Sequence, residues 1–198
     1  MRLRTVLLDL DGVIRHFDPA HVAGVEQRHG LQPGSLPATA FESALLDRVI
    51  TGRISRSDWV TEVGRRIGNL AAAEQWMADR GWVDDAMMRE VDRLRSGGHV
   101  VAVLTNGTDT IAEEMRELGL DDRLDAVFNS AELGVAKPDL RAFQLVASML
   151  DVDPTTVFFT DDSESKLSGA VELGMTARRF VGVETFRRHL VELGITSA

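Results

Sequence analysis

Two aspartates stand two residues apart at the end of a short apolar run near the start of the chain. The run Val6-Leu7-Leu8 is typical of a buried β-strand, and Asp9, Asp11 and Gly12 follow it. Side chains two apart on a strand point to the same face, so both carboxylates are predicted to reach into one space. Two ionised carboxylates that close repel each other, which points to a bound divalent cation or to catalysis. The alternative is a strand that ends in an ordinary Asp-Gly turn.

Polar residues also follow three later segments that are predicted as strands. They are Thr105, Asn106 and Gly107 after the run 99–104, Lys137 after the run 126–128, and Thr160, Asp161 and Asp162 after the run 157–159. In an open parallel sheet, ligands bind outside the carboxyl ends of the strands. We therefore expect these residues and the first aspartate pair at one rim of the sheet.

The motif Thr105-Asn106-Gly107 has two interpretations. Its hydroxyl and its backbone N–H groups at the start of a predicted helix suit an anion. The same residues are also typical of a turn with a helix cap. Lys137 can neutralise an anion there, although a single lysine is most often a solvated surface residue.

Carboxylates from the first and last motifs predict a Mg²⁺ site. Asp9, Asp162 and the backbone or side chain of Asp11 offer oxygen ligands, which suit Mg²⁺ with water and a substrate phosphate in its remaining positions. Asp161 and Asp162 can equally cap the helix that follows them, and one can do so while the other binds metal. Each ordinary interpretation is acceptable singly, but four motifs in this order favour one site.

The elements that position these residues are predicted by apolar strands that alternate with amphipathic helices. This pattern indicates parallel β-α units with right-handed crossovers, and hence an α/β fold with a doubly wound, Rossmann-like sheet. Residues 16–87 have a helical period and predict an inserted all-helical cap domain without a strand, so the core is expected in residues 1–15 and 88–198. Expected helices span 19–29, 39–50, 55–67, 71–80, 84–95, 108–118, 138–150, 163–173 and 184–193, with a loop at 32–37 and a last strand at 176–181.

Charge and composition exclude several classes of protein. The 198 residues carry a formal charge of −9 and no cysteine. No sequence-wide attraction to nucleic acid or to an anionic membrane is expected, and disulfides and a cysteine nucleophile are excluded. No apolar run is long enough to span a membrane, and the first residues do not form a secretory signal, so a cytoplasmic protein is predicted.

The four motifs together resemble those of the haloacid dehalogenase-like (HAD) superfamily. The matching segments are Asp9-Leu10-Asp11-Gly12-Val13, Leu104-Thr105-Asn106-Gly107, Lys137-Pro138-Asp139 and Phe159-Thr160-Asp161-Asp162-Ser163. The resemblance covers nearly the whole chain, since the predicted helical insertion corresponds to the helical cap domain of that superfamily. It implies a hydrolase of the phosphatase branch.

The resemblance also implies a role for each matching residue. Asp9 is the nucleophile that becomes an aspartyl-phosphate, and Asp11 is the general acid and base. The phosphoryl group is held by Thr105, Asn106, Gly107 and Lys137, and Mg²⁺ is held by Asp9, Asp11 and Asp162.

The fourth motif departs from the superfamily pattern at one position. Many members have Asp or Asn four residues after the metal-ligand aspartate, where this chain has Lys166. That lysine is expected to alter the outer shell of the metal or to pair with Asp161, which is assigned to the second shell. Asp162 is the preferred metal ligand.

The expected substrate is a small phosphorylated metabolite, with no nucleic-acid or membrane partner and no oligomeric state indicated by the sequence. Residues where the chain leaves the core, Arg15, His16 and Phe17, and the loop residue Arg53 are candidates for substrate contact. The alternatives are a 2-haloacid dehalogenase, against which Asp11 and the acidic pair argue, and a non-catalytic phosphate-binding protein of the same fold. A nucleotide-cofactor Rossmann enzyme is disfavoured because no Gly-x-Gly-x-x-Gly loop follows the first strand.

Overall fold

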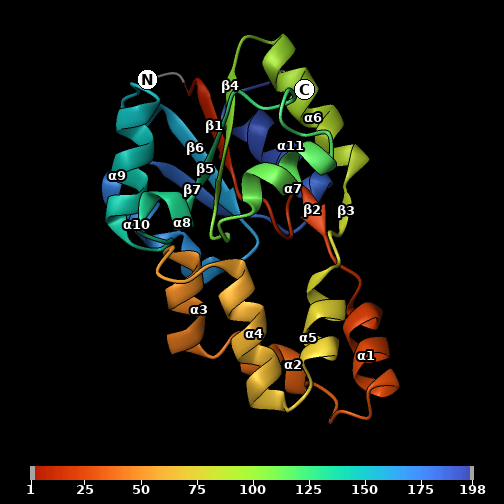
Figure 1. Cartoon of the computed structure of the whole chain (residues 1–198). Helices are drawn as coiled ribbons and strands as arrows, with labels where there is room; N and C mark the ends of the chain where they lie inside the picture. Colours follow the sequence, from red (N-terminus) through yellow and green to blue (C-terminus); the bar gives the residue numbers. More distant parts are fainter. Residues whose placement is uncertain (1–2, 197–198) are drawn as a thin grey trace.

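A five-stranded parallel sheet between two layers of helices forms the larger part of the molecule, and a helical insertion lies beyond one end of its strands (Figure 1). The computed structural model describes residues 3–196. The strand order is β5-β4-β1-β6-β7 and every neighbouring pair is parallel. The strands are β1 (Thr5–Leu8), β4 (Val100–Thr105), β5 (Ala126–Asn129), β6 (Val157–Asp161) and β7 (Thr176–Arg179).

The central strand β1 shows why both faces of the sheet are covered. All four of its residues are buried. Val6 and Leu8 belong to one hydrophobic cluster, with Met87 of α6 (Asp85–Ser96) and Phe186 of α11 (Val183–Glu192). Leu7 points to the opposite face, because side chains alternate along a strand. The predicted doubly wound α/β fold is confirmed.

Two further helices cover the second face of the sheet. Leu7 packs in a cluster with residues of α9 (Leu140–Met149) and α10 (Ser168–Leu173). The remaining elements of this part are α7 (Ile111–Glu117), α8 (Ser130–Leu133), and the 3₁₀ turns η1 (Pro154–Thr156) and η2 (Glu164–Lys166).

The helical insertion has a hydrophobic cluster of its own. It consists of α1 (Pro19–Arg28), α2 (Ser35–Ala40), α3 (Ser43–Ile50), α4 (Arg56–Ile67) and α5 (Leu70–Met77). Fully buried residues from different helices, among them Val25, Leu36, Leu45 and Val63, pack together there. Their separation from the two clusters of the sheet agrees with the change of sequence pattern, while the domain boundaries themselves stay a prediction.

The structure corrects the predicted start of the second helix. The segment 32–37 was expected as a loop, yet α2 begins at Ser35 and includes Pro37. Proline is tolerated there because backbone N–H groups in the first turn have no partner inside the helix. The helix expected from residue 39 begins at Ser43 as α3, and Glu42 caps it, since its carboxylate accepts hydrogen bonds from the N–H groups of Ala44 and Leu45.

A pair of two-residue strands joins the helical insertion to the sheet, where no strand was predicted. β2 (Arg15–His16) pairs antiparallel with β3 (Trp82–Val83). Two residues are too few to produce an alternating pattern in the sequence. As a result, the two crossings of the chain are tied together side by side.

The ends of other helices differ from the predicted ends by a few residues. α5 ends at Met77 rather than at residue 80, and α9 begins at Leu140 because Asp139 is its N-cap. The helix predicted at 163–173 is divided into η2 and α10. No helix in the described range 3–196 is long and apolar enough to cross a bilayer.

Candidate active site

The four polar motifs meet at the carboxyl ends of the strands, as their positions in the sequence predict. They line a cavity of about 330 Å³, which is bordered by Asp9, Asp11, Gly12, Thr105, Asn106, Lys137, Asp161, Asp162, Ser163 and Lys166. Asp9 directly follows β1, and its backbone N–H donates to the carbonyl oxygen of Thr160 on β6. The hydrogen bonding of the sheet therefore fixes the position of the first aspartate.

A buried lysine joins two aspartates at the centre of this cavity. The Lys137 Nζ atom donates to Oδ1 of Asp9 and to Oδ2 of Asp161, with both distances 2.7 Å. The side chain of Lys137 is 1% exposed. It is one of only two lysines in the chain, and the other, Lys166, borders the same cavity. A cation so far from water is retained only where carboxylates compensate its charge.

Burial changes the ionisation of Asp9. Desolvation, together with the neighbouring charge of Asp161, raises the pKa of Asp9 to about 7, against the opposing charge of Lys137. Desolvation and the charge of Asp161 also raise the pKa of Asp162. The site thus holds more negative charge than its lysine neutralises.

Three carboxylates form a group that could hold a cation. One oxygen from each of Asp9, Asp161 and Asp162 lies within 4.8 Å of the others. Asp162 lies against Gly12, because a Cβ atom placed on Gly12 would be 2.3 Å from Oδ2 of Asp162. Asp161 accepts hydrogen bonds from Lys137 and from the backbone N–H of Ser163. Hard oxygen ligands of this kind suit Mg²⁺.

The Lys137 backbone is held by the second and fourth motifs. Its N–H donates to Oδ1 of Asn106, and its carbonyl accepts from Nδ2 of Asn106, each at 2.8 Å. The Nζ atom of Lys166 donates to the same carbonyl at 3.3 Å. Asn106 therefore positions the lysine through its side chain, a contact that the predicted backbone role of Asn106 did not include. Among the contacts of residues 3–196, Lys166 does not pair with Asp161, which was one of its two expected roles. Asp161 pairs with Lys137 instead.

The second aspartate of the first motif faces an arginine. Asp11 accepts hydrogen bonds from Nε and Nη2 of Arg15, at 2.5 and 3.1 Å. Its side chain is 43% exposed, whereas that of Arg15 is 4% exposed. Asp9 and Asp11 border one cavity, but their carboxylates have different partners.

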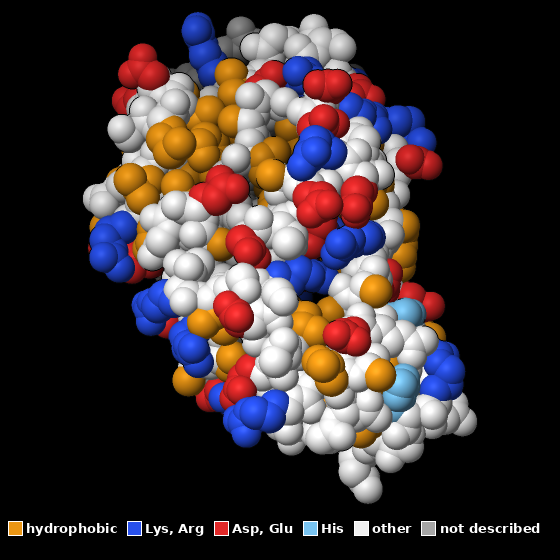
Figure 2. Space-filling view, in the orientation of Figure 1, with side chains coloured by type: hydrophobic (Ala, Val, Ile, Leu, Met, Phe, Trp, Pro, Cys, Tyr) orange, Lys and Arg blue, Asp and Glu red, His pale blue; other side chains and the backbone are white. Residues whose placement is uncertain are grey.

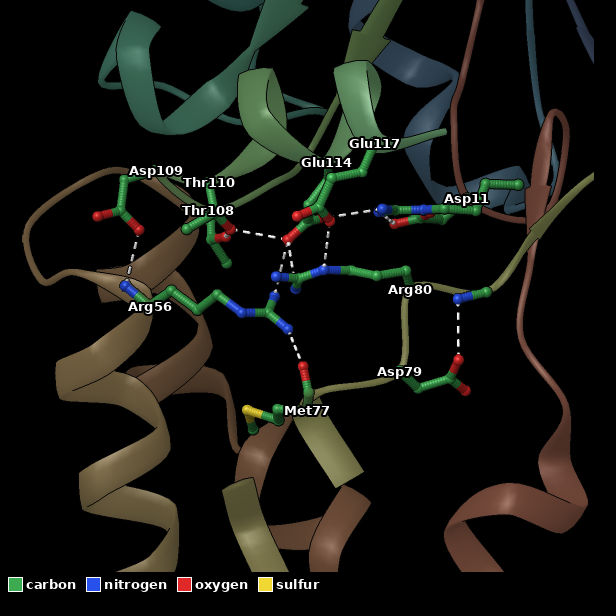
Figure 3. Close-up of polar contacts among 12 residues, drawn as sticks. Asp11, Arg56, Met77, Asp79, Arg80, Thr108, Asp109, Thr110, Glu114 and Glu117 are labelled. Carbon is green, nitrogen blue, oxygen red and sulfur yellow. Dashed lines mark hydrogen bonds and ion pairs between the residues drawn. The ribbon is translucent and has the colours of Figure 1, made fainter. Parts of the chain in front are cut away.

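A charged network that the sequence did not predict continues from Arg15 to the helical insertion (Figure 3). Nη1 of Arg15 donates to Oε2 of Glu114 on α7 at 2.6 Å. The other oxygen of Glu114 contacts Arg56 on α4 at 3.2 Å and Arg80 at 3.3 Å. Burial raises the pKa of Glu114, but hydrogen bonds from Arg15 and Thr110 outweigh it and hold the pKa below its usual value. The available signal in the sequence was the position of Glu114, which lies on the same helical face as the apolar residues Ile111 and Met115.

Two of the candidate substrate contacts lie away from the site. The ring of His16 contacts that of Trp82 in a tilted arrangement and lies 3.6 Å from Asp84. Arg53 is 63% exposed and pairs with Asp47. Neither side chain borders the cavity of the four motifs. Neither borders the larger cavity of about 380 Å³ that lies between the helical insertion and the sheet. Arg15 and Phe17 do border the larger cavity.

A doubly wound sheet with carboxylates and a buried lysine at its carboxyl rim defines an enzyme of the Rossmann-like α/β class. Residues 3–174 match the model of the haloacid dehalogenase-like hydrolases. The chain belongs to this family and is a hydrolase.

Relatives with assigned activities include both a phosphatase and a dehalogenase. The chain is 29% identical over 192 residues to phosphatase MT3486 of Mycobacterium tuberculosis (strain CDC 1551 / Oshkosh). The alignment covers 89% of this chain and 87% of that protein. It is 32% identical over 90 residues to (S)-2-haloacid dehalogenase 4A of Burkholderia cepacia, covering 45% of this chain and 39% of that protein.

A solved structure with the same fold belongs to the HAD family enzyme BT-2542 of Bacteroides thetaiotaomicron, in complex with magnesium and inorganic phosphate. The superposition covers 89% of this chain and 93% of the BT-2542 chain, with a TM-score of 0.75 and 22% identity. At that identity the likeness shows the fold.

Proposed function

We propose that this hydrolase is a Mg²⁺-dependent phosphatase that hydrolyses a phosphomonoester through a covalent intermediate on Asp9. The observation that carries the proposal is the pairing of the buried Lys137 with Asp9, beside two further carboxylates. A carboxylate approaches a phosphate dianion only where cations neutralise the site. Lys137 supplies one positive charge, and a cation held by the neighbouring carboxylates would supply the rest.

The hydrogen bonds of Asp9 support its role as the nucleophile. Oδ1 accepts from Lys137 and from the backbone N–H of Leu10, which fixes the orientation of the carboxylate. Among the hydrogen bonds of residues 3–196, none reaches Oδ2 of Asp9. That oxygen is available for attack on phosphorus.

The reaction has two balanced steps. An oxygen of Asp9 forms a bond to phosphorus while the bond between phosphorus and the leaving oxygen breaks, and Asp11 donates its proton to that oxygen. Water then attacks the phosphorus of the aspartyl-phosphate and gives a proton to Asp11, and the bond to Asp9 breaks. The products are an alcohol and inorganic phosphate.

The acidic residues present fit a bound Mg²⁺. Carboxylates of Asp9 and Asp162 and the backbone carbonyl of Asp11 would hold it, with Asp161 beside them. When bound, the ion supplies positive charge that offsets the carboxylates and the phosphoryl oxygens. The magnesium and phosphate in the structure of BT-2542 support this assignment.

The decisive experiment measures phosphate release from p-nitrophenyl phosphate with Mg²⁺ and with EDTA. We expect activity with Mg²⁺, its loss in EDTA, and a loss on the order of a thousandfold or more in Asp9→Asn. The control is Asp121→Asn, because Asp121 is exposed between α7 and β5. Activity that persists in EDTA or in Asp9→Asn would disprove the mechanism.

Dehalogenation is the second candidate, favoured by the 32% identity to (S)-2-haloacid dehalogenase 4A. In that reaction Asp9 would attack carbon and displace halide, and Asp11 would have no proton to transfer to the leaving group. Chloride release from 2-chloropropionate, measured on the same preparation, distinguishes the two. Release that exceeds phosphate release would replace the phosphatase proposal.

A further inference from the structure

A second cavity lies between the helical insertion and the sheet, next to the general acid. Its volume is about 380 Å³, and it shares Asp11 and Asn106 with the cavity that contains Asp9. Asp11 is proposed to give its proton to the leaving oxygen. The group attached to that oxygen must therefore extend past Asp11, and this cavity is the space that adjoins Asp11 there.

The wall of the second cavity is mainly apolar. Its apolar residues come from all five helices of the insertion, from the segment that leads into it and from α7, and they include Phe17, Val22, Leu46, Ile50, Trp76 and Ile111. Figure 2 shows acidic and basic side chains at the junction of the sheet and the insertion, with hydrophobic side chains directly below them. Binding of a ligand to apolar walls of this kind is favourable when an apolar group of the ligand displaces water from them.

The two arginines on this wall already have anionic or carbonyl partners. Arg15 is bound by Asp11 and Glu114. Arg56 contacts Glu114 and donates a short hydrogen bond to the carbonyl of Met77 (Figure 3). Both cations are therefore compensated before any ligand enters.

The remaining charged side chains of the wall are acidic. Asp18 caps α1 through the N–H of Ala20, and Asp79 accepts from the N–H of Gly81. With Asp11 and Glu114, four carboxylates face two arginines around the cavity. A carboxylate or second phosphate on the leaving group would meet repulsion there and no unpaired cation.

We propose that the second cavity binds the alcohol part of the substrate and that this part is an uncharged, apolar group. The proposal rests on the proposed phosphatase function and names its substrate class: an aliphatic or aromatic phosphomonoester rather than a sugar phosphate, a nucleotide or a phosphorylated acid. A cavity of about 150 Å³ holds benzene, so 380 Å³ corresponds to roughly ten to fifteen carbon atoms.

Binding of alkylphosphonates tests the proposal without turnover, because a carbon–phosphorus bond is not cleaved by the proposed reaction. Dissociation constants are measured by calorimetry for the wild-type protein with Mg²⁺, from methylphosphonate to octylphosphonate. We expect affinity to rise about threefold to fourfold for each added methylene. An ω-carboxyalkylphosphonate of equal length should bind at least tenfold more weakly than its uncharged counterpart.

Variants locate the alkyl chain. Leu46→Trp, on α3, should fill part of the cavity, so that affinity stops rising after the first few carbons. The matched control is Leu70→Trp, on α5, because Leu70 is 45% exposed and does not border the cavity. Val22→Phe, on α1, is a second variant that fills part of the same cavity, and it replaces Leu46→Trp if that variant does not fold.

The outcomes separate this proposal from the phosphatase function. Affinity that does not change with chain length, or tighter binding of the carboxylate series, would overturn the apolar substrate class while phosphate release from p-nitrophenyl phosphate remains. Absence of any phosphate release would instead overturn the proposed function. A chain-length dependence that is unchanged in both filled-cavity variants would also overturn the proposal.

Discussion

Lys137 is the residue on which the charge balance of the cavity around Asp9 depends. Its ammonium group lies 2.7 Å from carboxylate oxygens of Asp9 and Asp161, both of which are buried. Removal of one member of a buried ionic group is costly because the remaining charges lose their compensation. We therefore expect removal of the lysine to destabilise the fold, in addition to its proposed effect on phosphate binding.

We expect Lys137→Met to lower the free energy of unfolding by about 3 kcal/mol at pH 8. Burial already raises the pKa of Asp9 to about 7, and loss of the lysine raises it further. A raised carboxyl pKa destabilises the folded state as pH increases above the unfolded value, so the deficit should be smaller at pH 5 than at pH 8. Urea unfolding at both pH values measures this difference.

Lys166→Met is the matched control for that substitution. Lys166 donates only a 3.3 Å hydrogen bond, to the carbonyl of Lys137, and is half-buried. We expect a loss below about 1 kcal/mol with little dependence on pH. Equal losses in the two variants would show that the ionic group does not stabilise the fold.

At the scale of elements, the turn after β1 brings two motifs into contact. Gly12 has a φ of +84°, and no Cβ fits there because Asp162 occupies the space. The first and fourth motifs come from neighbouring strands, β1 and β6, and in the turn after β1 Gly12 packs directly against the side chain of Asp162. A side chain at this glycine would displace a proposed metal ligand.

We expect Gly12→Ala to weaken Mg²⁺ binding by about tenfold or more, since displaced supporting groups have effects of that size at metal sites. Gly98→Ala is the control, because Gly98 has a φ of +81° and no atom within 4 Å of an added Cβ. Both substitutions strain the backbone by about 1–2 kcal/mol, but only the first meets Asp162. Calorimetric titration with Mg²⁺ compares them, and equal affinities would contradict the assignment of Asp162.

At the scale of the molecule, the sheet and the helical insertion have separate hydrophobic clusters. Val101 of β4 is buried in a cluster between the sheet and α6, and Val63 of α4 is buried within the insertion. The two parts meet through the small sheet β2-β3, the wall of the second cavity and the network around Glu114. This arrangement predicts that the insertion opens at a lower free energy than the sheet.

Val63→Ala and Val101→Ala test that prediction as a matched pair, since both residues are fully buried. Each substitution should cost about 2 kcal/mol from lost burial and the cavity it leaves. Hydrogen exchange should accelerate in the helices of the insertion alone, α1 to α5, for Val63→Ala, and throughout the molecule for Val101→Ala. Accelerated exchange of the β1 amides in Val63→Ala would show that the two parts unfold together.

The sequence by itself determined the layers of the sheet and the rim at which the polar motifs meet. Apolar runs such as 99–104 and the residues that follow them are local patterns, and parallel strands bring their carboxyl ends together whatever the details of packing. For the same reason Asp9, Thr105, Lys137 and Asp162 could be named before the fold was known. The two-residue strands β2 and β3 left no such pattern.

Only the tertiary structure decided which partner each charged group has. Arg15 and Glu114 are 99 positions apart, and Asn106 meets the backbone of Lys137 across 31 positions. The apolar cavity beside Asp11 likewise combines residues of the insertion with residues of α7. Contacts of this kind depend on how complete elements pack against one another, and no periodicity along the chain records them.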